Sequence, residues 1–218
     1  MYFNKSNSFY HGIMFHHFHD NNIHTKSQGS ISKDDFYKII QFIGRKNILD
    51  ADIFFDKYKR KKLKENEVCI TFDDALKCQI DIALPVLDDL KIKSFFFVYT
   101  SIFEDNPDTL EIFRHFRNNY FNSIDDFYIS FYKVLNKDLS AFFRMNEKKI
   151  YDTVVKFPFY STEDVKYRLV RDKLLTKTDY GKIIISMMDE KKIKPKDFYS
   201  NLFFSKEDLK NLNKLGHL

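Results

Sequence analysis

The sequence predicts an α/β fold with a helical insertion, and three observations support this class. Two apolar runs, "VCITF" at 68–72 and "KSFFFVYT" at 93–100, are typical of strands that are covered on both faces. A segment with apolar residues at helical spacing separates them, so strand, helix and strand form a βαβ unit. From 105 to 196 the sequence shows only helical periodicity. We therefore expect one domain over 1–218, with 105–196 as an insertion.

The first elements follow from local signals. "GIMFHHF" at 12–18 predicts a strand, and a polar loop follows it. Ser32 and Asp35 form a capping pair, and apolar residues then recur at helical spacing until Gly44. The segment at 78–92 predicts the crossover helix of the βαβ unit, with Pro85 in its first turns or at a kink.

The insertion and the tail contain further helix signals. Each predicted helix begins at a Ser-x-x-Asp pair or carries an apolar stripe. These signals are Ser123 with Asp126, Ser161 with Asp164, the stripe Ile183, Ile184, Met187 and Met188, and Ser205 with Asp208 before a stop at Gly216. The Met and Phe stripes are expected in the core, because helical spacing alone explains them.

Composition excludes several classes of protein. The net charge is only +5, and the one dense basic run, "KYKRKKLK" at 57–64, is interpreted as a solvated helix end or loop, so no nucleic-acid partner is expected. The sequence contains no apolar stretch of membrane-spanning length and no export signal, so we expect a cytoplasmic protein. Cys69 and Cys78 are expected to be reduced, buried thiols.

The residues with the clearest chemical signal are Asp73 and Asp74, at the end of the strand at 68–72. In parallel sheets, functional groups collect beyond the carboxyl ends of the strands. Two adjacent carboxylates favour a bound cation, because their repulsion would otherwise raise one pKa. The alternative is that Asp74 caps the helix that begins near Cys78. A cap would explain one aspartate but not both.

Three separated blocks, in order, resemble the polysaccharide deacetylase family (NodB homology, carbohydrate esterase family four). The blocks are "IMFHHFHD", "ITFDDA" with the βαβ unit that ends in "SFFFVYT", and "LNKLGHL" at 212–218. The family usually has Tyr-His in the first strand, TFDDG in the second block and ATFFV in the next strand. The resemblance implies a partial, distorted (β/α) barrel of polysaccharide deacetylase type, interrupted by the helical insertion.

The resemblance also implies roles for individual residues. Asp73 would be the general base that activates water, and Asp74 would be a direct ligand of a divalent metal, Zn²⁺ in the first instance. His16 or His17 matches the family's Tyr-His position near the substrate; alternatively, the pair is only the polar end of a strand. His11, His24 and His115 are expected to be incidental surface residues, and His217 belongs to the approach to the metal strand rather than to the ligands.

Two departures from the family pattern affect these expectations. Ala75 replaces the usual Gly, which is tolerated if the backbone there has negative φ. The family's His-x-x-x-His metal pair, its Arg-Pro segment and its closing His motif have no counterparts in the sequence. A catalytic zinc typically needs three protein ligands. We therefore expect an incomplete deacetylase domain that binds zinc weakly or not at all, is catalytically silent and self-associates.

The expected reaction of a complete enzyme is metal-dependent hydrolysis of an N-acetyl or similar acyl group on an amino sugar or glycan. Two alternatives remain open. One is a non-catalytic carbohydrate-binding or assembly module that uses the same pocket. The other is a magnesium-dependent phosphohydrolase, which would need a Gly-rich phosphate-binding turn, and none of the five glycines lies near Asp73.

Overall fold

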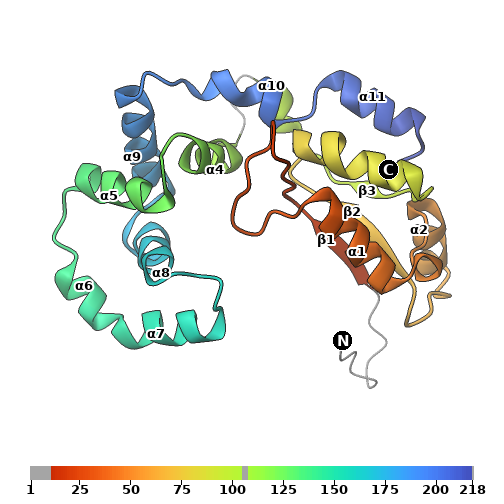
Figure 1. The fold of residues 1–218 in the computed structure, drawn as a ribbon, viewed down its shortest axis with the longest axis horizontal. Helices are drawn as coiled ribbons and strands as arrows, with labels where there is room; N and C mark the ends of the chain where they lie inside the picture. The colour runs from red at the N-terminus through yellow and green to blue at the C-terminus, as the bar shows by residue number, and fades with distance from the viewer. Residues whose placement is uncertain (1–10, 105–107, 218) are drawn as a thin grey trace. The chain divides into compact units, whose positions relative to one another are not determined.

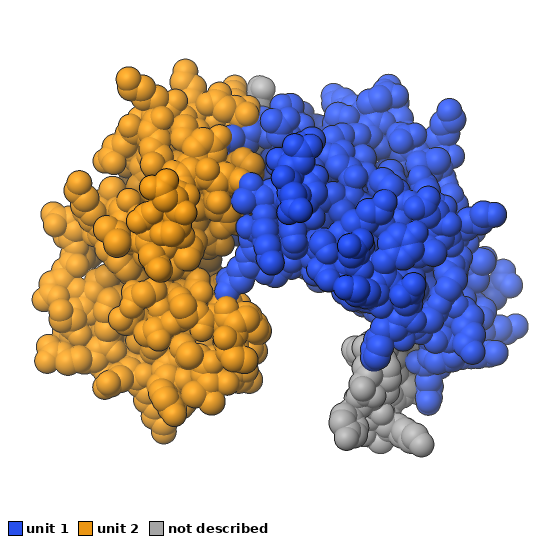
Figure 2. Space-filling view, viewed as in Figure 1, with its two compact units in different colours: residues 1–111, 198–218 blue, residues 112–197 orange. Residues whose placement is uncertain are grey.

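The computed structural model of the protein describes residues 11–104 and 108–217. The chain divides into two compact units, residues 1–111 with 198–218, and residues 112–197 (Figure 2). The second unit has nearly the range of the predicted insertion. That this range is an insertion within a single domain stays a prediction. No helix of the described residues is long and apolar enough to cross a membrane.

The first unit contains a small parallel sheet with helices (Figure 1). Its elements are β1 His11–Phe15, α1 Lys33–Ile43, η1 Arg45–Asn47, α2 Ala51–Lys59, β2 Val68–Phe72, η2 Gln79–Ala83, α3 Leu84–Asp89, β3 Phe95–Phe96, η3 Thr100–Phe103, the start of α4 Leu110–Asn119, the end of η5 Pro195–Phe198, α10 Tyr199–Leu202 and α11 Lys206–Lys214. The mixed α/β class is therefore confirmed.

The sheet has the order β1-β2-β3, and both pairs of neighbours are parallel. Sequential order of parallel strands is the arrangement found in (β/α) barrels. Within the described residues the sheet has three strands and is open, so a barrel is not observed. All five residues of β2 are buried, as predicted for a strand covered on both faces.

Two strands are shorter than predicted. β1 ends at Phe15 rather than at residue 18, because the chain turns away where the polar residues His16 and His17 begin. β3 pairs with β2 only through Phe95 and Phe96, and the chain enters the 3-10 helix η3 at Thr100. β3 is the third strand in the order, and among the described residues it pairs only with β2, so no further described strand extends it.

The helix boundaries follow the predicted signals closely. The side chains of Ser32, Ser123, Ser161 and Ser205 all cap their helices, and three of them form complete capping boxes. Pro85 lies in the first turn of α3, and a π-helical turn, η2, precedes it. A proline lacks the N–H for the regular i to i−4 bond, so its position after the π-turn removes no interior bond of α3.

The described elements of the second unit are all helices. It comprises most of α4, α5 Ile124–Leu135, α6 Ser140–Met145, α7 Glu147–Lys156, α8 Thr162–Leu169, the π-helix η4 Val170–Leu174 and α9 Lys177–Glu190. Its core is aromatic, with Phe127, Phe131 and Tyr167 all buried and their rings in contact. Met187 and Met188 are buried too, which confirms that the Met stripe is part of the core.

Candidate metal and catalytic site

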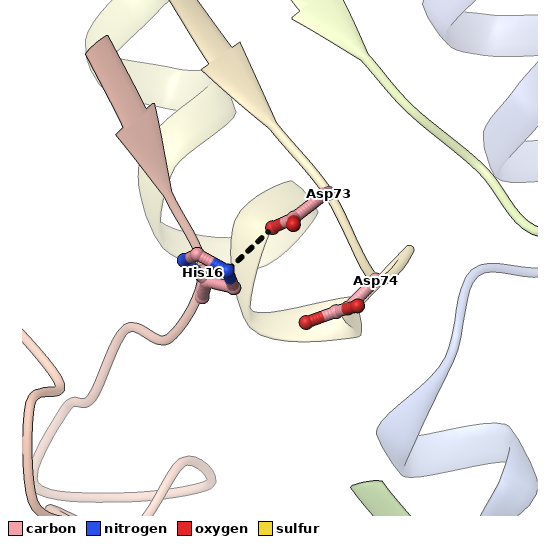
Figure 3. A group of neighbouring side chains, drawn as sticks. All are labelled: His16, Asp73 and Asp74. Atoms are coloured by element: carbon pink, nitrogen blue, oxygen red, sulfur yellow. Dashed lines mark ion pairs between the residues drawn. The ribbon is translucent and has the colours of Figure 1, made fainter. Parts of the chain in front are cut away.

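The register of the sheet brings His16 and Asp73 together. Phe15 at the end of β1 is paired with Phe72 at the end of β2, so the next residue of each chain lies beyond the same edge. His16 Nε2 is 3.1 Å from Asp73 Oδ1, and the two side chains are 40% and 27% exposed. Figure 3 shows the imidazole directed at the carboxylate from the neighbouring strand end. The predicted residues therefore meet where parallel strands end, and solvent reaches them.

Asp74 joins this pair because the backbone changes conformation after Asp73. The φ angle is +66° at Asp74 and +50° at Ala75, so two consecutive non-glycine residues are left-handed. The extended alternation of β2 stops there, and the carboxylates of Asp73 and Asp74 can lie near one another (Figure 3). The condition under which alanine would be tolerated at position 75, a negative φ, is therefore not met. The Cβ of Ala75 is held in a conformation that costs roughly 1–2 kcal/mol per residue, which explains why glycine is usual in the family motif.

His16, Asp73 and Asp74 form a candidate metal site. Each offers one ligand atom, and these atoms all lie within 4.8 Å of one another. Among residues 11–104 and 108–217 this is the only group of three or more His, Cys, Asp or Glu side chains with such spacing. Burial raises the pKa of Asp74, and the negative charges of Asp73 and Glu111 raise it further. A cation would remove this repulsion.

The alternative that Asp74 is a helix cap is not supported. The π-helix η2 has Cys78 as its N-cap residue, and no side chain caps it by a hydrogen bond. Both aspartates are therefore available to the site.

Gln79 ties together the two segments that carry the site, and sequence reasoning missed this. Its side chain is fully buried, and Nε2 donates hydrogen bonds to the backbone oxygens of His16, at 2.9 Å, and Asp73, at 2.6 Å. One amide thus fixes the ends of β1 and β2 relative to each other. Gln79 is also the first residue of η2, and π-turns are frequent at functional sites.

His17 has a different partner from His16. Its Nε2 is 3.1 Å from Glu111 Oε2, and the two side chains are only 14% and 5% exposed. Tyr99, which follows β3, has its pKa raised by burial and by the charges of Glu111 and Asp74. Glu111 and Tyr99 thus line the same acidic region. The predicted span 93–100 included Tyr99, but no signal pointed to Glu111.

None of the other described histidines and thiols is a member of this group. His24 is not an incidental surface residue, because its Nε2 is 2.9 Å from Asp81 Oδ2 and its side chain is 10% exposed. His115 is half-buried, and the side chain of His11 lies outside the described residues. His217 is buried and accepts a hydrogen bond from the Ser94 N–H, before β3, which is the opposite end of the sheet.

The cysteines are chemically quiet. Cys69 and Cys78 are free and buried, as expected. Burial raises the pKa of Cys69 to about 11 and that of Cys78 to about 12, so both thiols stay protonated at neutral pH.

Comparison with known proteins supports the resemblance. The polysaccharide deacetylase family model matches residues 60–116, which include β2, both aspartates, Gln79 and Glu111. Over this segment the resemblance is confirmed, and it suggests hydrolysis of acetyl amides on glycans. The family is generally metal-dependent, in keeping with the His/Asp group. Neither the curated proteins nor the solved structures contained a match to the chain.

Proposed function

We propose that the protein is a metal-dependent hydrolase that removes N-acetyl or similar acyl groups from an amino sugar within a glycan. One observation carries the proposal: the ends of β1 and β2 gather His16, Asp73 and Asp74 within 4.8 Å, inside or beside the segment that matches the deacetylase family. A cytoplasmic location stays a prediction from the sequence alone.

The donor set suits a divalent cation such as Zn²⁺. One imidazole and two carboxylates are ordinary zinc ligands, and each binds at about 2.0–2.2 Å. We assign Asp74 and His16 as ligands. His16 thereby takes one of the places that the His-x-x-x-His pair fills in the family, so this proposal replaces the expectation of a catalytically silent chain that binds zinc weakly or not at all.

When bound, the cation polarises the amide carbonyl and the attacking water. Asp73 takes a proton from that water as general base, and Asp74 and His16 would hold the cation beside it. The hydroxyl adds to the carbonyl carbon and the C–N bond breaks. The nitrogen receives the proton that Asp73 took from water and leaves as a free amine, and the acyl group leaves as a carboxylate. The buried pair of His17 and Glu111 lies beside the acids and shapes the substrate side of the site.

The test is release of acetate from N-acetylglucosamine oligomers by the purified protein with added Zn²⁺. We expect Asp73→Asn to abolish turnover while the protein still binds zinc, and Asp74→Asn to weaken zinc binding itself. His24→Gln is the matched control, because His24 also pairs with an aspartate but stands outside the group.

Each outcome decides between the candidate functions. Absence of both zinc binding and acetate release in the unmodified protein would favour the carbohydrate-binding module. Zinc binding by Asp74→Asn at the parent's affinity would overturn the role of Asp74.

A further inference from the structure

The basic run at 57–64 forms an exposed surface that the proposed function does not use. Residues 51–64, the helix α2 and the turn after it, carry six basic and two acidic side chains, which leaves a net charge of +4. The net charge of the whole chain is +5, so this one segment is nearly as positive as the entire chain. Lys57 is bound to Glu67, but the other five basic residues are exposed: Lys59, Arg60, Lys61, Lys62 and Lys64.

Apolar side chains lie among these charges. Ile53, Phe55 and Tyr58 on α2 are 46%, 44% and 56% exposed. Lys59 Nζ lies 4.2 Å from the centre of the Phe55 ring. Ala51 is the one fully buried residue of α2, and Ile53, Phe55 and Tyr58 each leave about half of their surface to solvent. A solvated helix end does not account for large apolar groups among lysines.

We propose that α2 and the turn at 60–64 dock on an anionic phospholipid surface. Clusters of four to eight Lys and Arg on an amphipathic helix attract anionic headgroups, and aromatic and aliphatic side chains insert between them. Phosphates of a nucleic-acid duplex would match the charge, but they offer no apolar partner for Ile53 and Phe55. The combination therefore favours lipid.

The position of the surface is compatible with catalysis. The turn at 60–64 leads into the first residue of β2, whereas Asp73 follows the last (Figure 1). A five-residue strand is roughly 16 Å long, so docking leaves the His16 group open to a glycan. This inference does not depend on the proposed function.

The experiment is co-sedimentation of the full chain with vesicles of phosphatidylcholine alone or with added phosphatidylglycerol. We expect binding to the anionic vesicles only, and weaker binding as salt increases. The triple variant Lys59→Gln, Lys61→Gln, Lys62→Gln should lose affinity by a factor on the order of 100. Phe55→Ser should lose about tenfold, because an inserted apolar group is removed.

The matched control is Lys206→Gln, Lys210→Gln, Lys214→Gln on α11, which removes the same charge from another exposed helix of the same unit. It should bind within about threefold of the parent, and circular dichroism should show that all variants are folded. Failure of the parent to bind, equal losses in both triple variants, or tighter binding to a DNA duplex than to the vesicles would overturn the proposal.

Discussion

The carboxylates at the two ends of β2 have opposite electrostatic environments. At the amino end, Glu67 is buried, pairs with Lys57 and accepts a hydrogen bond from the Lys64 N–H. Burial alone would raise the pKa of Glu67, but these partners stabilise the carboxylate and hold its pKa below the ordinary value. At the carboxyl end, Asp74 has its pKa raised by burial and by neighbouring acids.

The difference shows where the strand supports structure and where it supports chemistry. A carboxylate with matched partners stabilises the fold and has little capacity left for a ligand. Two carboxylates that repel each other destabilise the protein without a cation, and they do so on a left-handed backbone that is itself costly. Such cost is characteristic of sites that bind charge or transfer protons.

The largest stability effect is expected from Gln79→Met, which keeps the size of the side chain but removes its donor. The backbone oxygens of His16 and Asp73 lose partly buried hydrogen bonds, at a cost of roughly 2–4 kcal/mol. Urea unfolding measures the loss. A metal titration far below the unfolding temperature should also show weaker binding, which a purely structural role would not produce.

The control for this variant is Ile82→Val, a buried residue of the same π-turn, with an expected cost of about 1 kcal/mol and unchanged metal affinity. The role of Gln79 in fixing the ends of β1 and β2 would be refuted if Gln79→Met lowered the free energy of unfolding by no more than Ile82→Val does.

Glu67→Gln should destabilise the protein by about 2 kcal/mol, because the charged hydrogen bond with Lys57 is lost. Since the folded pKa of Glu67 is lowered, its contribution is present above the ordinary value of 4.5 and is lost as pH falls through the folded pKa. The difference in the free energy of unfolding between parent and variant should therefore become smaller at acidic pH. Denaturant unfolding at neutral and acidic pH measures it, and a difference independent of pH would contradict the assignment.

Ala75→Gly should act in the opposite direction and stabilise the protein by about 1 kcal/mol. Glycine accepts φ near +50° without the steric penalty of a Cβ, and this gain exceeds the loss of one buried methyl. Thermal unfolding measures the shift. A lower melting temperature would mean that the backbone at Ala75 is not strained.

The smallest effect is expected from Asp74→Asn without metal. Because the folded pKa of Asp74 is raised, its protonated form stabilises the fold, and that contribution is lost as pH rises through the folded pKa. Asn should thus be slightly more stable than the parent at neutral pH, with no difference below the ordinary pKa of 3.8. Unfolding in the presence of a chelator measures this; a less stable variant at neutral pH would contradict it.

Local signals in the sequence predicted much of this arrangement. The cap pairs at Ser32, Ser161 and Ser205 act within one turn, and the apolar run of β2 places Asp73 at a strand end. Two contacts were not predicted, because tertiary packing alone brings their residues together. The hydrogen bond of Gln79 to His16 joins residues 63 positions apart, and the pair of His17 with Glu111 joins residues 94 positions apart.

The left-handed backbone at Asp74 and Ala75 was not predicted, for a different reason. Alanine disfavours positive φ, so its own propensity pointed away from the conformation that the surrounding fold imposes. The length of β3 depends on what lies at the sheet edge, which its apolar sequence does not encode.

The most direct test of the central claim is calorimetric titration of the purified protein with Zn²⁺, for the parent, His16→Gln and His24→Gln. Loss of a ligand should weaken binding by more than the roughly 10–100-fold that is typical of residues behind the ligands. The account therefore predicts one site per chain, a loss of at least about 100-fold in His16→Gln, and parent-like binding in His24→Gln. Absence of zinc binding in the parent, or equal affinity in all three proteins, would contradict the assignment of the metal to the carboxyl ends of β1 and β2.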